Sequence, residues 1–226
     1  MNVLGIDIGG TGIKGGVVDT ATGGMASERL RYQTPPSRSR RDILEILADI
    51  VAELGWRGPV GCTFPGIIRN GRIAHEGNMA AEWRGVELAS ACSGVLGEAF
   101  FLNDADAAGN AEMCLGAGRG IGGTVVVLVF GTGLGSAVFA DGTPLPHMEL
   151  GNIRSRCGIL YGHQLSKIEK QRRELSWKQW GMVLGEYLED LQGLLHPDTV
   201  IITGTAGLHL HEYRGVLPPL QAKVLP

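Results

Sequence analysis

Residues 7–14 bring an acid, three glycines, a threonine and a lysine into eight positions, directly after the apolar run of residues 3–6. Glycines let backbone N–H groups approach an anion closely, and Lys14 adds a positive charge for a phosphate oxygen. Asp7 stands where it can hold Mg²⁺ or a water bound to it, since this ion prefers few carboxylates beside substrate phosphates. These residue types and their spacing predict a phosphate-binding loop.

The residues after this loop indicate which kind of phosphate site it is. Residues 15–19 are typical of a strand and are followed by a turn at residues 22–24, so the loop is predicted to be the tip of a β-hairpin. A dinucleotide-binding fingerprint must open a helix, and residues 10–15 therefore match it only formally. Residues 118–123 match it as well, in a chain with 36 glycines, and no Walker A spacing is present. The alternative is an ordinary glycine hairpin, which seldom carries both the leading acid and the trailing lysine.

Composition and charge exclude several classes of function. The 226 residues are 44% hydrophobic, which is enough for a core in one large or two small domains. The net charge of −3 gives no general attraction to nucleic acid or anionic membranes, and no apolar stretch is long enough to span a bilayer. No signal peptide is recognised, and the four cysteines have no Cys-x-x-Cys spacing. We therefore expect a cytoplasmic protein with reduced, mostly buried cysteines and without nucleic-acid or membrane partners.

Hydrophobic periodicity predicts an α/β chain whose second half repeats the pattern of the first. The predicted strands cover residues 3–8, 14–19, 28–33, 60–64, 99–102, 124–130, 137–140 and 199–203. The predicted helices cover residues 42–54, residues 104 to about 115, and a segment that begins after Ser176. The pattern of a strand, a glycine loop and a strand occurs a second time at residues 124–140, with the loop at residues 131–136. We expect two related lobes, residues 1–115 and 116–226, each with a phosphate-binding hairpin facing a shared cleft.

The two polar residues after the predicted strand at 99–102 are candidates for catalysis. Asn103 and Asp104 lie where a strand ends and a helix begins, and the helix dipole favours an ionised carboxylate there. An ionised acid can accept a hydroxyl proton late in phosphoryl transfer, because a weak base is sufficient for a loose transition state. The same pair is also typical of a helix N-cap, so the residues alone leave both roles open.

Three further polar residues lie in segments without the hydrophobic periodicity of a helix or a strand. Glu149 and Asn152 follow two prolines, and the Glu149 carboxylate can accept hydrogen bonds from substrate hydroxyls. An exposed loop glutamate is the ordinary alternative for Glu149, and Asn78 is equally ambiguous.

A basic run precedes the helix that begins after Ser176. It consists of Lys167, Lys170, Arg172 and Arg173. A polyanion longer than a nucleotide could lie along such a run, and its binding would then weaken steeply with salt. The alternative is a solvated helix face, because Glu169 and Glu174 are interspersed with the basic residues.

Taken together, the motifs resemble those of ROK-family sugar kinases, in the same order along the chain. They are residues 7–14, 62–66, 102–105, 131–136 and 149–151. Residues 144–151, 175–177 and 186–188 resemble the polyphosphate-dependent glucokinases within that family. The resemblance implies an α/β, actin-like ATPase fold, related to ribonuclease H, with two lobes around a central cleft. It also implies transfer of a phosphoryl group from polyphosphate, ATP or both, with Mg²⁺, to the 6-hydroxyl of glucose or a related hexose.

The resemblance also implies roles for individual residues. Asp104 matches the catalytic base, and Asp7 matches the residue that holds Mg²⁺ through a water. The implied sugar ligands are Asn78, Asn103, Glu149 and Asn152. The implied phosphate contacts are Gly9, Gly10, Thr11 and Lys14 in the first loop, Gly131, Thr132 and Gly133 in the second, and Gly204 near the far end of the donor. The zinc-binding cysteines of many ROK proteins are missing from this sequence, and a homodimer is expected.

Two departures from the family pattern keep a second function open. The family's Glu-x-Gly-His ends in Asn152 here, and residues 153–157 are basic where an acid would follow. The sequence also stops at residue 226, where family members usually continue into a further helix, so we expect either a clipped sequence or stabilisation by a partner chain. The alternative function is a catalytically weak sugar-binding or regulatory protein. A DNA-binding repressor is disfavoured, because the sequence begins at the first predicted strand.

Overall fold

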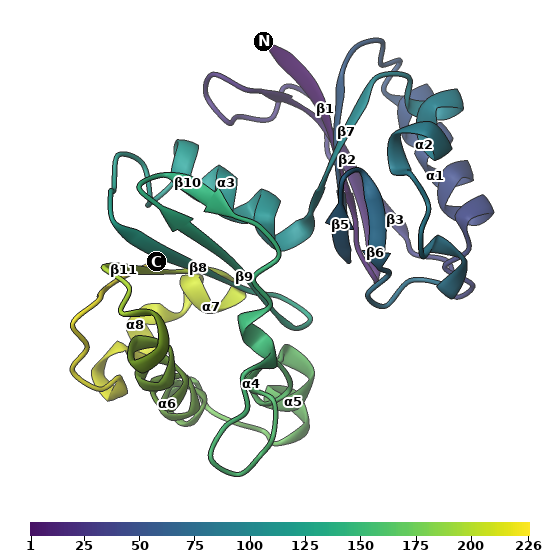
Figure 1. Ribbon diagram of the computed structural model, residues 1–226. Helices are drawn as coiled ribbons and strands as arrows, with labels where there is room; N and C mark the ends of the chain where they lie inside the picture. The colour runs from purple at the N-terminus through teal and green to yellow at the C-terminus, as the bar shows by residue number, and fades with distance from the viewer. The chain divides into compact units, whose positions relative to one another are not determined.

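Two five-stranded sheets organise the chain, one in each of two separate units. The computed structural model describes residues 1–226, which divide into residues 1–107 and residues 108–226 (Figure 1). The division falls within α3 (Asp104–Leu115), and not after residue 115 as the sequence pattern predicts.

The first sheet holds the predicted phosphate loop between its first two strands. Its strands are β1 (Asn2–Ile8), β2 (Gly12–Asp19), β3 (Leu30–Gln33), β4 (Val60–Phe64) and β7 (Ala99–Asn103). They lie in the order β3-β2-β1-β4-β7, with β1, β2 and β3 antiparallel and β1, β4 and β7 parallel. The carboxyl ends of the three parallel strands therefore meet at one edge of the sheet.

Two helices cover one face of this sheet (Figure 1). They are α1 (Arg40–Glu53) and α2 (Leu88–Leu96). The predicted period of residues 42–54 is confirmed, because Ile43, Leu47 and Ile50 of α1 are fully buried. Ser39 caps α1 by accepting a hydrogen bond from the backbone N–H of Asp42.

A small hairpin and a short helical turn lie between β4 and α2 in the chain. The hairpin consists of β5 (Ile67–Arg69) and β6 (Arg72–His75), and the turn is η1 (Ala81–Trp83). Asn70 and Gly71 both have positive φ, as a two-residue type I′ turn requires.

The second sheet repeats the order and directions of the first. Its strands are β8 (Thr124–Phe130), β9 (Leu134–Ala140), β10 (Thr143–Leu145), β11 (Thr199–Gly204) and β12 (Lys223–Leu225). They lie in the order β10-β9-β8-β11-β12. The strands β10, β9 and β8 are antiparallel, and β11 and β12 run parallel to β8. The two sheets therefore share one pattern of strand order and direction.

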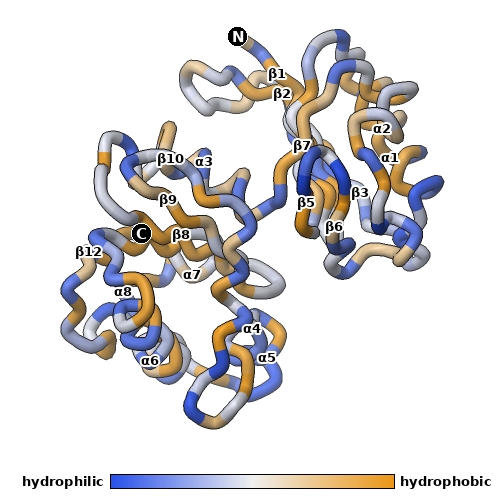
Figure 2. Tube along the Cα trace, in the orientation of Figure 1, coloured by the Kyte–Doolittle hydropathy of each residue, from blue (hydrophilic) through white to orange (hydrophobic).

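Helices cover both faces of the second sheet. On one face, α3 packs so closely that a Cβ on Gly109 would lie 2.5 Å from the Ala137 side chain. The other face is covered mainly by α4 (Tyr161–Gln164), α6 (Trp177–Leu195), α7 (Thr205–Leu208) and α8 (Leu210–Tyr213), with α5 (Lys167–Arg172), η2 (Leu150–Asn152) and η3 (Arg214–Val216) completing the unit. Figure 2 shows hydrophobic residues concentrated along β8 and β9, as a sheet buried on both faces requires.

The cysteines and the helices bear on two expectations from the sequence. All four cysteines are free, but only Cys62 and Cys92 are buried, so the expectation that most are buried was wrong for Cys114 and Cys157. None of the helices is long and apolar enough to cross a membrane.

Candidate active-site residues

The first glycine loop is a tight hairpin tip in the structure. The backbone N–H of Gly9 donates to the carbonyl of Gly12 over 3.1 Å, and the flanking residues Ile8 and Ile13 are paired across the ladder. A Cβ on Gly10 would lie 2.1 Å from the side-chain nitrogen of Asn78. A side chain at position 10 would therefore displace the Asn78 amide, and the same contact places Asn78 beside the loop.

Asp7 is the centre of a polar cluster at the carboxyl ends of β1 and β4. One carboxylate oxygen of Asp7 accepts a hydrogen bond from the Lys14 ammonium at 2.7 Å, and the other accepts from the Thr63 hydroxyl at 2.9 Å. Both Asp7 and Lys14 remain partly exposed, so their remaining bonding capacity is accessible to a ligand. Register explains the arrangement, because Asp7 pairs with Lys14 on β2 and with Thr63 on β4.

The predicted base and its neighbour lie at the carboxyl end of β7. Asn103 caps α3, because its side-chain oxygen accepts from the backbone N–H groups of Ala105 at 2.9 Å and Asp106 at 3.1 Å. The side-chain nitrogen of Asn103 donates to the carbonyl of Gly66 over 3.1 Å. Asp104 is exposed at the first residue of α3, where the helix dipole favours its negative charge.

The second glycine loop joins β8 and β9 in the second unit. The backbone N–H of Gly131 donates to the carbonyl of Gly133 over 3.0 Å, and residues 131–133 are all exposed. A Cβ on Gly131 or Gly133 would meet no atom within 4 Å, so a ligand can approach this backbone directly. Gly204 lies opposite Phe130 at the end of β11 with φ of 73°, and a Cβ there would lie 2.3 Å from the Phe130 carbonyl oxygen. Glycine is therefore required at position 204.

A pocket of about 150 Å³ adjoins this second loop. It is lined by Phe130, Gly131, Leu165, Lys167, Lys170, Gln171, Trp177, Trp180, Thr205 and Ala206. The Trp177 ring is held in place by a stacked His209 ring 4.3 Å away and by the Lys170 ammonium 4.4 Å from its centroid. The pocket therefore combines a fixed aromatic wall with the edge of a predicted phosphate loop.

Glu149 and Asn152 lie in a segment that is fastened to β9. The buried Ser136 hydroxyl donates to the carbonyl of Met148 and accepts from the backbone N–H of Leu150 at 2.9 Å, on either side of Glu149. The backbone N–H of Asn152 donates to the Glu149 carbonyl over 3.0 Å. Both side chains are exposed, as expected for groups that bind a substrate from solution.

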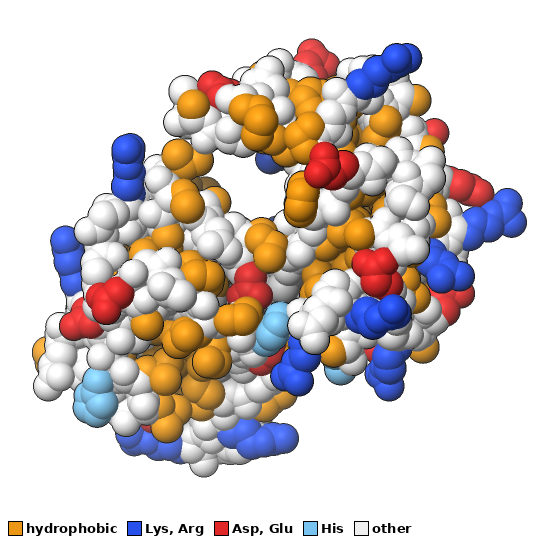
Figure 3. Space-filling view, turned by 45° about the horizontal axis from the view of Figure 1, so that its top comes forward, with side chains coloured by type: hydrophobic (Ala, Val, Ile, Leu, Met, Phe, Trp, Pro, Cys, Tyr) orange, Lys and Arg blue, Asp and Glu red, His pale blue; other side chains and the backbone are white.

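The predicted basic run is not a row of free cations. The Arg172 guanidinium makes two hydrogen bonds, of 2.8 and 2.6 Å, to the carboxylate of Glu169, and these bonds hold the pKa of that carboxyl below its usual value. The Lys170 ammonium donates to the Leu175 carbonyl over 2.8 Å. On the face drawn in Figure 3, basic and acidic side chains are interspersed. Lys167 and Arg173 are the exposed cations of the run that make neither kind of bond.

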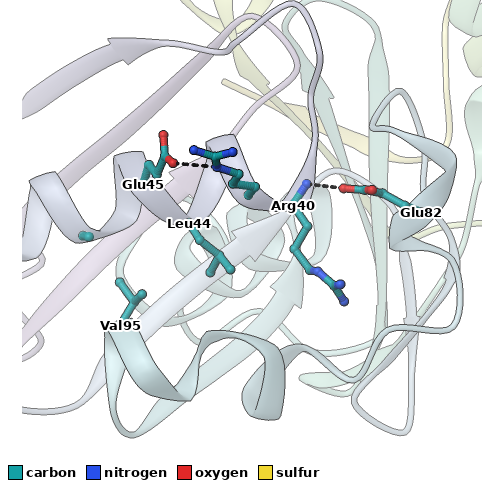
Figure 4. Close-up of a pocket in the computed structure, with 7 residues that line it drawn as sticks. Arg40, Leu44, Glu45, Glu82 and Val95 are labelled. Carbon is teal, nitrogen blue, oxygen red and sulfur yellow. Dashed lines mark hydrogen bonds and ion pairs between the residues drawn. The ribbon is translucent and has the colours of Figure 1, made fainter.

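A larger and more open pocket of about 490 Å³ lies elsewhere in the first unit (Figure 4). It is lined by Arg40, Arg41, Leu44, Glu45, Ala48, Glu82 and Val95, which come from α1, η1 and α2. It contains none of the residues at the strand ends, so we do not assign it to the active site.

Sequence reasoning missed several residues that the fold adds to these clusters. Thr63 binds Asp7, Arg38 binds the carbonyl of Asn78 over 2.7 Å, and Trp177 walls the second pocket. Thr63 lies in the motif of residues 62–66, but Asp7 is 56 residues away in sequence, and no periodicity predicts such a contact. Trp177 belongs to the predicted helix after Ser176, and it packs against the core while also lining the pocket.

Comparison with known proteins now defines the class. Residues 3–149 match the ROK family, and the chain belongs to that family. Its structure aligns over 100% of the chain with the inorganic polyphosphate/ATP-glucomannokinase of Arthrobacter sp. strain KM, at 37% identity and a TM-score of 0.91, covering 91% of that protein. The fold is accordingly the actin-like ATPase fold of the ROK sugar kinases.

Two further relatives support the family and the fold, respectively. The polyphosphate glucokinase of Mycobacterium tuberculosis is 36% identical over 203 residues, which are 89% of this chain and 76% of that protein. A ROK family glucokinase from Streptomyces griseus aligns with 100% of this chain and 94% of its own at a TM-score of 0.77. Its identity is only 22%, so this likeness supports the fold alone.

Proposed function

We propose that this protein is a glucokinase that transfers a phosphoryl group from polyphosphate, ATP or both to the 6-hydroxyl of glucose or a related hexose. The observation that carries the proposal is the 37% identity, across the whole chain, to a polyphosphate/ATP-glucomannokinase. That alignment spans both glycine loops and Asp104. The alternative of a sugar-binding or regulatory protein is not favoured, because the curated relatives at 36% identity are polyphosphate glucokinases.

The proposed chemistry follows from what each cluster can do. The exposed Asp104 carboxylate accepts the proton of the attacking hydroxyl, while the side chains of the sugar ligands hold the other hydroxyls. These proposed ligands are Asn78, Asn103, Glu149 and Asn152. Backbone N–H groups of the two glycine loops and the Lys14 ammonium neutralise phosphate oxygens. The proposed phosphate contacts are Gly9, Gly10, Thr11, Lys14, Gly131, Thr132, Gly133 and Gly204.

The donor set around Asp7 fits the Mg²⁺ that a phosphoryl transferase of this kind implies. There is no group of three or more His, Cys, Asp or Glu side chains that could cage a metal. A single partly exposed carboxylate with both oxygens already hydrogen-bonded suits Mg²⁺, which keeps several waters and takes its other ligands from substrate phosphates. Asp7 would hold the ion through a water, and the ion would neutralise charge on the transferred phosphoryl group.

The second pocket supports ATP as one of the donors. The wall made by Trp177 can contact the edge of a nucleobase, while Lys167 and the edge of the glycine loop lie on the same lining. Polyphosphate has no ring and needs only the loops and the exposed cations. We therefore propose that residues 108–226 carry the donor-binding pocket and residues 1–107 carry the first phosphate loop and Asn78. The homodimer and the cytoplasmic location stay predictions.

A matrix of acceptors and donors tests the proposed function. Glucose, mannose, galactose and N-acetylmannosamine are each offered with ATP and with polyphosphate, in Mg²⁺, and the initial rate of sugar phosphate formation is measured. We expect glucose to be the best or second-best acceptor and at least one donor to support turnover. Binding of hexoses without turnover in every combination would favour the regulatory alternative.

A further inference from the structure

The segment that joins β3 to α1 touches both the phosphate loop and the loop that carries Asn78. At its start, the Thr34 hydroxyl donates to the carbonyl of Gly9 over 2.5 Å. At its end, the Arg38 guanidinium donates to the carbonyl of Asn78 over 2.7 Å. We call residues 34–39 the strap.

The end of the strap at Arg38 is fastened to residues 78–83 at several points. The carbonyl of Arg38 accepts from the indole N–H of the fully buried Trp83 at 3.0 Å and from the backbone N–H of Ala80 at 3.4 Å. Next along the chain, the backbone N–H of Arg40 donates to the Glu82 carboxylate, as Figure 4 shows. The backbone contacts fix where the strap lies, and the guanidinium adds a charged hydrogen bond to the backbone of Asn78 itself.

Arg38 has a backbone conformation that arginine seldom adopts. Its φ is 49°, in the left-handed region that favours glycine and, less strongly, asparagine. Strain of this kind persists only where surrounding contacts over-determine it, and it concentrates near functional sites. The contacts of the Arg38 carbonyl supply that constraint, and the resulting turn brings the guanidinium to Asn78.

We propose that Arg38 is the positioning residue for Asn78, holding this acceptor ligand beside the Gly10 backbone while Thr34 holds the phosphate loop from the other end of the strap. The inference rests on the proposed function, because it takes Asn78 to bind the sugar. A hydrogen bond from a charged donor to a backbone carbonyl is among the stronger ones, so its loss should let the Asn78 side chain leave its place over Gly10.

Substitution of Arg38 separates positioning from a general role in stability. Arg38→Gly removes the guanidinium but relieves the backbone strain, so the fold should be retained. We expect the KM for glucose to rise about threefold to tenfold, while the KM for the phosphate donor changes by less than about twofold. Arg38→Lys, which keeps one cationic donor group, should fall between wild type and Arg38→Gly. Arg41→Ala is the control, because Arg41 is 86% exposed and paired only with Glu45 on the same helix.

Hydrogen exchange supplies a readout that needs no turnover. Amides of residues 76–80 should exchange faster in Arg38→Gly than in wild type, while amides of β1 should be unchanged. Faster exchange with a selective rise in the glucose KM supports the proposal. An unchanged glucose KM, or equal rises for sugar and donor, overturns it. If wild type itself forms no sugar phosphate, the proposed function fails, and unchanged exchange at residues 76–80 would then show separately that Arg38 does not brace this loop.

Discussion

Among single residues, the neighbours Asn103 and Asp104 at the end of β7 make different contacts. Asn103 caps α3 with its side-chain oxygen and binds the carbonyl of Gly66 with its nitrogen. Asp104 does make a 2.9 Å contact to the N–H of Ala105, but Asn103 already satisfies that donor. The sequence left Asp104 open between a cap and a base. Because Asn103 supplies the N-cap of α3, we propose the base as the role of Asp104.

Asp104→Asn should therefore lower kcat without unfolding the protein. The amide keeps the shape and one acceptor oxygen but cannot take a proton from the sugar hydroxyl, so we expect a loss of about two to four orders of magnitude. Steady-state kinetics measures the loss, and thermal unfolding with glucose-binding calorimetry controls for folding and affinity. Near-normal kcat in a folded variant would reduce Asp104 to a helix-terminal acid.

Asn152 is the residue at which the chain departs from the family motif. It is exposed on η2, directly after the segment that Ser136 fastens to β9. A neutral amide still donates and accepts hydrogen bonds, but its reach differs from that of an imidazole. We expect a weak apparent affinity for glucose and a KM lowered roughly threefold in Asn152→His. A KM that stays the same or rises would mean that this position does not meet the sugar.

At the scale of elements, the loop between β6 and α2 is braced by an ion pair as well as by Arg38. The Arg84 guanidinium makes hydrogen bonds of 2.8 and 2.7 Å to the nearly buried Glu76 carboxylate. These hydrogen bonds hold the pKa of Glu76 below its usual value. A carboxyl with a lowered folded-state pKa adds stability at neutral pH, which is lost as the pH falls through that lowered pKa.

Glu76→Gln should therefore flatten the acid side of the stability profile. Stability from the pair is fully present above the ordinary glutamate pKa of about 4.3 and declines below it, so the wild type should lose more stability than the variant between about pH 5 and pH 3. Urea unfolding at a series of pH values measures this. Parallel profiles for the two proteins would show that the pair contributes nothing that depends on Glu76 ionisation.

The Trp177 wall at the start of α6 gives a test of donor choice. Trp177→Leu removes the aromatic wall while keeping an apolar side chain against the core, so the KM for ATP should rise by up to about tenfold. The KM for polyphosphate should change little, because that donor has no ring. Ser176, which caps α6 through a capping box with Gln179, is untouched. Equal losses with the two donors would indicate a general disturbance of the second unit.

The elements show how far local sequence patterns reach. Residues 60–64 and 124–130 were predicted as strands with the observed bounds, because both are short apolar runs ended by turn residues. The short helices α4 and α5 were not predicted, because they contain too few residues to show a helical periodicity of hydrophobic side chains. The contact of Arg38 with Asn78 spans 40 positions, and the unusual φ of Arg38 has no signature in an arginine. Such features depend on tertiary packing and are seen only in the folded chain.

At the scale of the whole molecule, one sheet pattern is used twice with different additions. Each sheet carries a glycine hairpin after its first strand, and each places polar or glycine residues at the carboxyl ends of its parallel strands. The first unit adds Asp7, Asn78 and Asn103 at that edge, whereas the second adds the pocket beside Gly131 and Gly204 at the end of β11. The repeat explains why two similar loops occur in one sequence and why their surroundings differ.

If this chain phosphorylates glucose at its 6-hydroxyl, the product itself will show which oxygen carries the phosphoryl group. Wild type is incubated with glucose, Mg²⁺ and either polyphosphate or ATP, and the products are followed by phosphorus and carbon NMR. We expect the signals of glucose 6-phosphate with at least one donor, far slower product formation with Asp104→Asn, and no product after Mg²⁺ is removed by a chelator. A folded wild type that binds glucose yet forms no hexose phosphate with either donor, or one that phosphorylates another hydroxyl, would contradict it.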